Sequence, residues 1–281
     1  MDTPPGSLDA LIGKRALIMG ILNVTPDSFS DGGRYLHIDR AIEHAHQMLN
    51  EGADLIDVGG ESTRPGSEPV SAREELDRVI PVIRALASHC AVSVDTTKYE
   101  VAAAALEAGA CFLNDISGLT YDPRLAELAA AHAAHLCVMH MQGTPRTMQQ
   151  APAYEDVVHE VTRFLADSRQ RALTAGVPAH RIWLDPGIGF GKTVAHNLEL
   201  LRHLDQICTL GSPVLVGVSR KSFIGRILND APTDARLFGG AAAVTAAVLS
   251  GAHMVRVHDV QAMADTVRIA EAIRDGWEPP V

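Results

Sequence analysis

Short apolar runs alternate along the chain with longer stretches that have the periodicity of helices. The runs are continuous and rich in branched residues, which predicts parallel strands that are covered on both faces. We expect eight such strands, at Ala16–Val24, Leu55–Val58, Ala91–Val94, Cys111–Ile116, Leu136–Met139, Ile182–Leu184, Pro213–Val218 and Met254–Val257.

An amphipathic or alanine-rich stretch follows each run, and glycines such as Gly52 and Gly109 stand where helices should end. The expected helices are Asp39–Glu51, Ser71–Ser88, Tyr99–Ala108, Pro123–Ala133, Tyr154–Ala175, Val194–Leu204, Asp234–Ser250 and Val260–Arg274. Strict alternation of strand and helix predicts an α/β protein with a parallel sheet and right-handed crossovers. Eight units close a TIM (β/α)8 barrel, and a doubly wound sheet is the alternative.

Polar residues end nearly every apolar run, where a hydrophobic core has no use for them. They are Asn23, Asp57, Asp95, Asn114, His140, Asp185, Lys221, and Arg256 with His258. In a barrel the carboxyl ends of all strands meet at one rim, whereas an open sheet spreads them along an edge. This pattern favours the barrel. Asp57, Asp115 and Asp259 are as readily interpreted as helix N-caps or hydrogen-bonding groups inside the barrel.

Composition fits one domain over residues 1–281, with a core over about residues 16–275. Hydrophobic residues make up 47% of the chain and aromatic ones only 4%, so the core must be mainly aliphatic. The net charge of −10 argues against non-specific binding to nucleic acid or to an anionic membrane. The apolar run near the N-terminus is too short to span a bilayer. The four cysteines form no C-x-x-C pair, and we expect a cytoplasmic protein.

The charges at the predicted rim fall into two groups. Asp95, Asn114 and Asp185 follow strands three, four and six, whereas cations follow strands two, seven and eight. This division suits a ligand with a donor-rich heterocyclic edge at one end and an anion at the other. A guanidinium can also lie against a flat ring.

Three loops carry distinctive residues. The segment Gly187–Thr193 fails as a Walker A motif because Pro186 stands where that motif needs glycine, and it also fails as a dinucleotide fingerprint. We expect its glycines to let the loop approach a flat ligand. The loop after strand one holds Phe29 among polar residues, and the loop after strand two, Gly59–Gly66, is similar in character. Both are interpreted as lids.

Together these segments resemble the dihydropteroate synthase family, from Ile18 to His258 and in the same order. The matching segments are Met19–Gly33, Asp57–Gly66, Ser93–Thr96, Asn114–Asp115, Met139–Gly143, Leu184–Gly187, Ser219–Ser222 and Arg256–Asp259. The resemblance implies a TIM-barrel transferase that joins 4-aminobenzoate to (7,8-dihydropterin-6-yl)methyl diphosphate, releasing pyrophosphate. It also implies a homodimer formed through the last helices, and competition by sulfonamides.

The resemblance further implies a role for each matching residue. Catalytic residues would be Asp95, Lys221 and Arg256. The pterin diphosphate would contact Thr63, Asp95, Asn114, Met139, Asp185, Gly217, Lys221, Arg256 and His258. The 4-aminobenzoate side would consist of Phe29, Thr63, Arg64, Pro65, Phe190 and Ser222. Asn23 would be the protein ligand of Mg²⁺.

Two rival functions stay open on the sequence alone. A pterin-dependent methyltransferase also holds a folate ring at the strand ends of a barrel, but it has no use for the diphosphate-binding set of Asn23, Arg256 and His258. The loop Thr63–Pro65 also argues against it. A catalytically silent paralogue would keep the barrel without turnover, and the loops after strands one and two argue against it. The expected chemistry needs no strong general base, because an arylamine is already nucleophilic, and no Ser-His-Asp arrangement is found.

Overall fold

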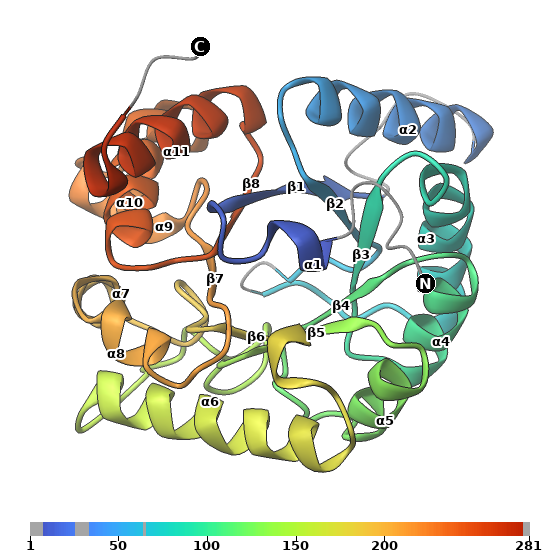
Figure 1. Ribbon diagram of the computed structural model, residues 1–281, viewed down its shortest axis with the longest axis horizontal. Helices are drawn as coiled ribbons and strands as arrows, with labels where there is room; N and C mark the ends of the chain where they lie inside the picture. Colours follow the sequence, from blue (N-terminus) through green and yellow to red (C-terminus); the bar gives the residue numbers. More distant parts are fainter. Residues whose placement is uncertain (1–7, 26–33, 64–65, 278–281) are drawn as a thin grey trace.

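Eight parallel strands form one sheet in the computed structural model, which describes residues 8–25, 34–63 and 66–277 (Figure 1). The strands are β1 Leu17–Asn23, β2 Leu55–Gly59, β3 Ala91–Asp95, β4 Phe112–Asp115, β5 His135–Met139, β6 Ile182–Asp185, β7 Leu215–Gly217 and β8 Met254–Val257. Their order is β6-β5-β4-β3-β2-β1-β8-β7. A parallel bridge between Leu184 and Val214 joins β6 to β7 and closes the ring. The structure confirms the TIM barrel and excludes the doubly wound sheet.

Helices surround the barrel and occupy most of the predicted ranges. They are α2 Arg34–Asn50, α3 Ala72–Leu86, α4 Tyr99–Glu107, α5 Arg124–Ala131, α6 Val157–Thr174, α7 Val194–Arg202, α8 Leu204–Cys208, α9 Ser222–Ile227, α10 Leu237–Leu249 and α11 Val260–Asp275. Side-chain caps start three of them: the backbone N–H groups of Glu74, His159 and His196 donate to Ser71, Asp156 and Thr193.

Several predicted boundaries are wrong. α2 begins at Arg34 rather than Asp39, and α9 was not expected. The stretch predicted as one helix from Asp234 is a 3₁₀ turn, Thr233–Arg236, followed by α10. The start of α2 and the turn before α10 are differences at the ends of elements, where sequence periodicity carries the least information. α9 is a whole element that was missed, because six residues are too few to show a helical period.

Alternation along each strand divides the core into two layers. On β2, Ile56 and Val58 face outward and pack in the large cluster between barrel and helices. Leu55 faces inward and belongs to a second cluster inside the barrel, together with Phe112 and Trp183. Because both faces of each strand are buried, the sequence reads as an unbroken apolar run. The inward positions nearest the carboxyl ends of β2, β3, β4, β6 and β8 are polar: Asp57, Asp95, Asn114, Asp185 and Arg256.

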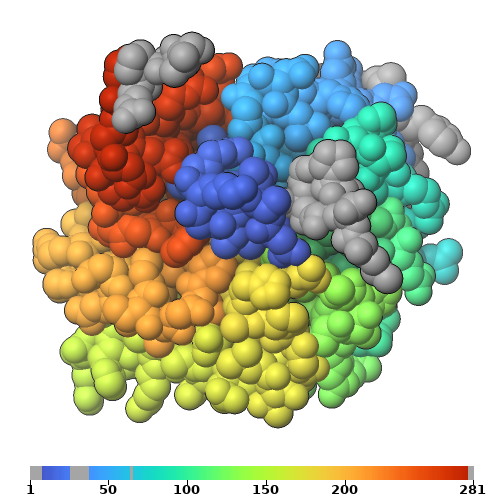
Figure 2. Space-filling view, in the orientation of Figure 1, coloured from blue at the N-terminus to red at the C-terminus, as the bar shows by residue number. Residues whose placement is uncertain are grey.

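A short helix that was not predicted, α1 Leu8–Leu11, closes the amino-terminal end of the barrel. Leu8 is buried against the inner cluster, and Leu11 and Ile12 pack beside it. In Figures 1 and 2 this segment, in dark blue, lies over the centre of the ring. The polar residues gather at the opposite end of the barrel. None of the helices in the described ranges is long and apolar enough to cross a membrane.

Candidate active site

Arg256 lies at the centre of the carboxyl-end rim and bridges two carboxylates. Its Nε donates to Asp57 Oδ2 over 2.6 Å, and one of its terminal nitrogens donates to Asp95 Oδ2 over 2.8 Å. The side chains of Asp57 and Asp95 are 0% and 7% exposed, so these ion pairs are largely screened from water. Strand β8 supplies the guanidinium, while β2 and β3 supply the carboxylates.

Asp57 is a hydrogen-bonding group inside the barrel, one of the two interpretations that the sequence left open. Its Oδ1 accepts from Ser93 Oγ over 2.5 Å, and its Oδ2 accepts from Asn114 Nδ2 over 3.1 Å. Asp57 therefore fixes the orientation of both Asn114 and Arg256. Ser93 was missed as a site residue, although its inward position two residues before Asp95 is a signal that strand alternation provides.

Asp115 and Asp259, whose roles the sequence also left open, make different contacts from Asp57. Asp115 accepts hydrogen bonds from the backbone N–H groups of Ser117 and Leu119, and so orders the turn after β4. Asp259 occupies the N-cap position of α11 without a side-chain cap, and it pairs with Arg220 instead.

Asp185 and Lys221 form the second half of the rim. Asp185 is buried, and its Oδ1 accepts from the backbone N–H of Gly187 over 2.7 Å. Lys221 donates from Nζ to the carbonyl of Ile188, and this ammonium lies 4.7 Å from the centre of the Phe190 ring. The loop after β6 therefore touches Lys221 at two points and brings Phe190 into the rim.

A buried lysine holds this loop in place. Lys192 Nζ lies 2.9 Å from His140 Nδ1 and donates to the carbonyls of Gly187, Phe190 and His140 over 3.0, 2.9 and 3.3 Å. Burial and the nearby lysine lower the pKa of His140 to about 3, so its neutral ring can accept from the ammonium. Lys192, which sequence reasoning treated only as part of a failed motif, is thus the internal support of the loop.

The glycines of the loop have a different cause from the one expected. At Gly187 (φ +66°) an added Cβ would lie 1.9 Å from the carbonyl oxygen of His140. At Gly191 (φ +61°) it would lie 2.5 Å from the carbonyl oxygen of Gln142. Close packing against the loop after β5 therefore requires both glycines, whether or not a ligand is bound.

The pKa values of several ionisable side chains at the rim are shifted far from their ordinary values. Burial raises the pKa of Asp95 to about 7, with Arg256 opposing the shift and Asp57 adding to it. Burial lowers the pKa of Lys221 to about 8, against the effect of Asp185. Although burial disfavours a charged Arg256, the two carboxylates beside it raise its pKa further. Perturbed groups of this kind cluster at functional sites.

The remaining predicted residues surround this centre at different distances. Met139 pairs with Asp185 in the sheet, and Gly217 pairs with Arg256. His258 lies just beyond β8, with its Nδ1 3.1 Å from Ser219 Oγ. Thr63 lies in the loop after β2, and Ser222 is the exposed first residue of α9. Phe29, Arg64 and Pro65 lie outside the described residues.

Asn23, the predicted Mg²⁺ ligand, ends β1 beside Gly59 of β2. Its Oδ1 lies 3.7 Å, and Asp95 Oδ2 lies 3.8 Å, from the point that a Cβ on Gly59 would occupy. Among the described residues no group of three His, Cys, Asp or Glu side chains is placed to hold a metal by itself. One amide oxygen at an open rim fits Mg²⁺ that takes most of its ligands from substrate phosphate and water.

Most of the barrel matches the model of one known protein family. The model of the pterin binding enzyme family matches residues 19–258. The chain belongs to the pterin-binding enzyme family, whose match spans the barrel from β1 to the end of β8.

Individual relatives show to which group within this family the chain belongs. A dihydropteroate synthase from Synechocystis sp. is 49% identical over 263 residues, which cover 93% of this chain and 91% of the relative. The dihydropteroate synthase of Yersinia pestis, solved with a sulfonamide drug, superposes with a TM-score of 0.87 at 47% identity, covering 93% and 95% of the two chains. That of Xanthomonas albilineans, solved with 4-aminobenzoic acid, gives 0.86 at 45% identity and covers 93% and 94%. Within its family, the chain is a member of the dihydropteroate synthases, which are transferases.

The raised pKa of Asp95 predicts a pH-dependent stability difference for Asp95→Asn. The folded-state pKa of about 7 exceeds the ordinary value of 3.8, so the buried carboxyl costs stability increasingly as the pH rises from about 4 to 7. Asparagine cannot ionise. We expect urea unfolding to show that the variant gains roughly 2–4 kcal/mol relative to the wild type between pH 4 and pH 8.

The exposed Asp205 of α8 offers a matched control, because Asp205→Asn removes a carboxyl outside the barrel. Its difference from the wild type should not change in this way with pH. An Asp95→Asn difference that is the same at pH 4 and pH 8 would show that the Asp95 pKa is not raised.

Proposed function

We propose that the carboxyl-end rim of this dihydropteroate synthase binds (7,8-dihydropterin-6-yl)methyl diphosphate and 4-aminobenzoate and joins them to give 7,8-dihydropteroate and pyrophosphate. The observation that carries the proposal is that buried carboxylates and cations lie side by side at the rim. Asp95 and Asp185 are buried and supply acceptor oxygens, with Arg256 beside Asp95 and Lys221 near Asp185. The substrate needs both kinds of group, because it combines a donor-rich ring with an anionic leaving group.

The pterin ring would lie between strands β3, β4 and β6. Asp95 and Asn114 are paired in the sheet, so a carboxylate and an amide stand side by side for the mixed donor and acceptor edge. Asp185 offers a second carboxylate opposite Lys221. Met139 and Gly217 would line the pocket, and the Cβ position of Gly217 lies 3.7 Å from Lys221 Nζ and 3.8 Å from Arg256 Cβ.

The diphosphate would lie near strands β1 and β8. Arg256 and His258 are close along the chain, and Asn23 is one strand away, since β1 pairs directly with β8. Mg²⁺ held by Asn23 and the phosphate oxygens would act as a Lewis acid that stabilises charge on the departing oxygen. Arg256 and His258 would add hydrogen bonds to the same anion.

The 4-aminobenzoate side would be built from loops. Thr63 comes from the loop after β2, Phe190 from the loop after β6, and Ser222 from the start of α9. Phe29, Arg64 and Pro65 are proposed with them on the family resemblance alone. A sulfonamide, which resembles 4-aminobenzoate in shape, would occupy the same position, and a solved relative that holds such a drug supports this.

The chain's residues would assist one substitution at the methylene carbon. The C–O bond breaks and its electron pair leaves with pyrophosphate, while the arylamine nitrogen forms a C–N bond and loses a proton to solvent. Asp95 would stabilise positive charge that spreads into the pterin ring as the C–O bond breaks. Lys221 and Arg256 would hold the ring in position. The protein thus contributes orientation and electrostatics rather than a covalent nucleophile.

Incubation of the protein with both substrates and Mg²⁺ should yield 7,8-dihydropteroate, detected by chromatography. Asp185→Ala should weaken pterin binding about tenfold to a hundredfold in calorimetry, because the ring's donors lose a charged acceptor. Asp205→Asn should bind as the wild type does. Absence of product under all conditions would refute the proposed reaction, and unchanged pterin affinity in Asp185→Ala would refute the ring assignment.

The magnesium proposal predicts that Mg²⁺ strengthens pyrophosphate binding in the wild type and much less in Asn23→Ala, as measured by calorimetry with and without the ion. The reason is that the amide oxygen is the protein's own contribution to the coordination shell. Asp185→Ala, at the opposite side of the rim, should keep the full magnesium effect. An equal effect in Asn23→Ala would remove Asn23 as the ligand.

A homodimer through the last helices is also proposed. α10 and α11 pack side by side (Figure 1), and they carry large exposed apolar side chains: Phe238 is 85% exposed, Ile269 63% and Ile273 66%, with Trp277 following at 71%. Such a concentration of apolar surface is typical of an interface.

Sedimentation velocity should therefore show a dimer for the wild type and a monomer for the double variant Ile269→Asp/Ile273→Asp. Tyr121→Asp, which alters an equally exposed side chain before α5, should remain dimeric. A monomeric wild type at micromolar concentration would contradict the proposal.

A cytoplasmic location remains part of the proposal. A diphosphate ester is multiply charged and does not cross a bilayer, because burying its charge in hydrocarbon costs far too much. The enzyme should therefore work in the compartment where this substrate is made.

A further inference from the structure

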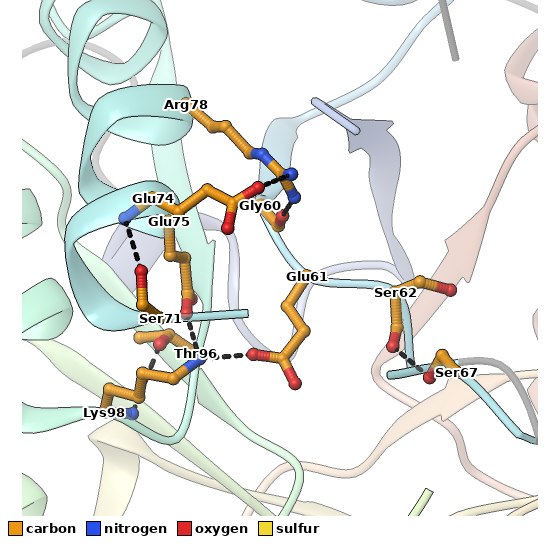
Figure 3. A network of polar contacts seen from close by, with 10 residues as sticks. All are labelled: Gly60, Glu61, Ser62, Ser67, Ser71, Glu74, Glu75, Arg78, Thr96 and Lys98. Carbon is orange, nitrogen blue, oxygen red and sulfur yellow. Dashed lines mark hydrogen bonds and ion pairs between the residues drawn. The ribbon is translucent and has the colours of Figure 1, made fainter. Parts of the chain in front are cut away.

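Lys98, just after β3, connects three segments behind the rim. Its Nζ donates both to Glu61, in the loop after β2, and to Glu75, in the first turn of α3. Its backbone N–H donates to Thr96 Oγ1 over 3.2 Å. Figure 3 shows the ammonium between the two carboxylates, with Thr96 beside it. Lys98 was not among the residues that the sequence singled out.

The contact is built into the interior rather than lying on the surface. The side chain of Glu75 is 1% exposed, that of Lys98 16% and that of Glu61 25%. Glu75 Oε1 is buried and has no hydrogen-bond partner among the described residues. Although burial disfavours the charged lysine, its hydrogen bonds to Glu61 and Glu75 raise its pKa. Lys98 is therefore the cation on which buried Glu75 depends.

The same segment of the β2–α3 loop is fixed at a second point. The carbonyl of Gly60 accepts from Arg78 of α3 over 2.7 Å. A Cβ on Gly60 would come within 2.8 Å of Val79 and 3.0 Å of Glu75, so the backbone lies directly against α3. Gly60 is thus held to one helix, and Glu61, its neighbour, is held to Lys98. Thr63, two residues further on, is the residue of this loop that is proposed to contact 4-aminobenzoate.

On the other side, Lys98 belongs to the segment that carries Asp95. The backbone N–H of Thr96 donates to the carbonyl of Asn114 over 3.2 Å, which fixes the end of β3 to β4. A single ammonium therefore ties the β2–α3 loop to the strand end that presents Asp95.

We infer that Lys98 is a positioning residue that sets the 4-aminobenzoate side of the site by holding Glu61, and through it Thr63, at a fixed distance from Asp95. This inference rests on the proposed function of Thr63. Lys98 touches neither substrate and acts through the loop. Of its two partners, Glu61 belongs to the loop that is positioned, and Glu75 belongs to helix α3, which anchors the lysine.

Glu61→Gln separates positioning from folding. It weakens the link from the loop to Lys98 while the buried Lys98–Glu75 pair stays intact. We expect the KM for 4-aminobenzoate to rise about tenfold, as loss of one charged hydrogen bond allows. The KM for the pterin diphosphate and the thermal midpoint should stay close to wild-type values. Arg202→Met, which breaks the exposed pair with Glu199 on α7, is the matched control and should change none of the three.

Lysine variants complete the test. Lys98→Arg keeps the charge and should largely preserve the KM for 4-aminobenzoate. Lys98→Met strands the Glu75 carboxylate, so the double variant Lys98→Met/Glu75→Gln is used to keep the interior neutral, and it should raise the same KM as Glu61→Gln does. Adding Glu61→Gln to that double variant should raise the KM no further, because the link is already lost.

Thr63→Val, measured alongside, separates the proposed role of Thr63 in binding 4-aminobenzoate from the positioning role of Lys98. If Thr63→Val leaves the KM for 4-aminobenzoate unchanged, the proposed role of the loop fails. If Thr63→Val raises it but Glu61→Gln does not, the positioning role of Lys98 is overturned. A fall in thermal midpoint with equal changes in both KM values would make the cluster merely structural, and would overturn the inference as well.

Discussion

One guanidinium shared by two buried carboxylates organises the rim. Arg256 reaches Asp57 from one side and Asp95 from the other, and neither carboxylate would be tolerable at that depth without it. Asp57 also accepts hydrogen bonds from Ser93 and Asn114. The Arg256–Asp57 ion pair therefore orients side chains on β2, β3 and β4 as well as on β8. Burying these charged side chains costs desolvation free energy. This arrangement is suited to a site that must present charge to a ligand rather than to one that merely stabilises the fold.

Much of the fold and of the rim was predictable, because both depend on local pattern. Eight apolar runs, each ending in polar residues, indicate a closed parallel barrel, and Asp95, Asn114, Asp185 and Arg256 do converge. The hidden part depends on register. Because β2 is buried on both faces, the facing of Asp57 could not be read from the sequence and its role stayed ambiguous. Ser93 was missed although it lies two residues before Asp95 and therefore faces the same way. The four-residue α1 is too short for its period to be recognised, although Leu8, Leu11 and Ile12 have helical spacing.

Lysines behind the rim explain how loops can act as parts of a rigid site. Lys192 fills the interior of the β6–α7 loop by donating to its carbonyls, and Lys98 joins the β2–α3 loop to the end of β3. Neither role has a sequence signature, because the partners are backbone oxygens in one case and distant carboxylates in the other. In both loops glycines allow the backbone to lie against a neighbouring segment, as Gly187 and Gly60 do. The lysine then fixes the loop in that position through its hydrogen bonds.

The two-residue alternation of the strands also limits how such an enzyme can diverge. Inserting or deleting one residue within β2 would turn Asp57 toward the helices and Ile56 into the barrel, which would lose the charge network and a packed side chain together. Heritable changes of length must therefore accumulate in the connecting segments. New ligand preferences in this lineage should arise by exchange of single inward side chains or by longer loops around an unchanged set of strands.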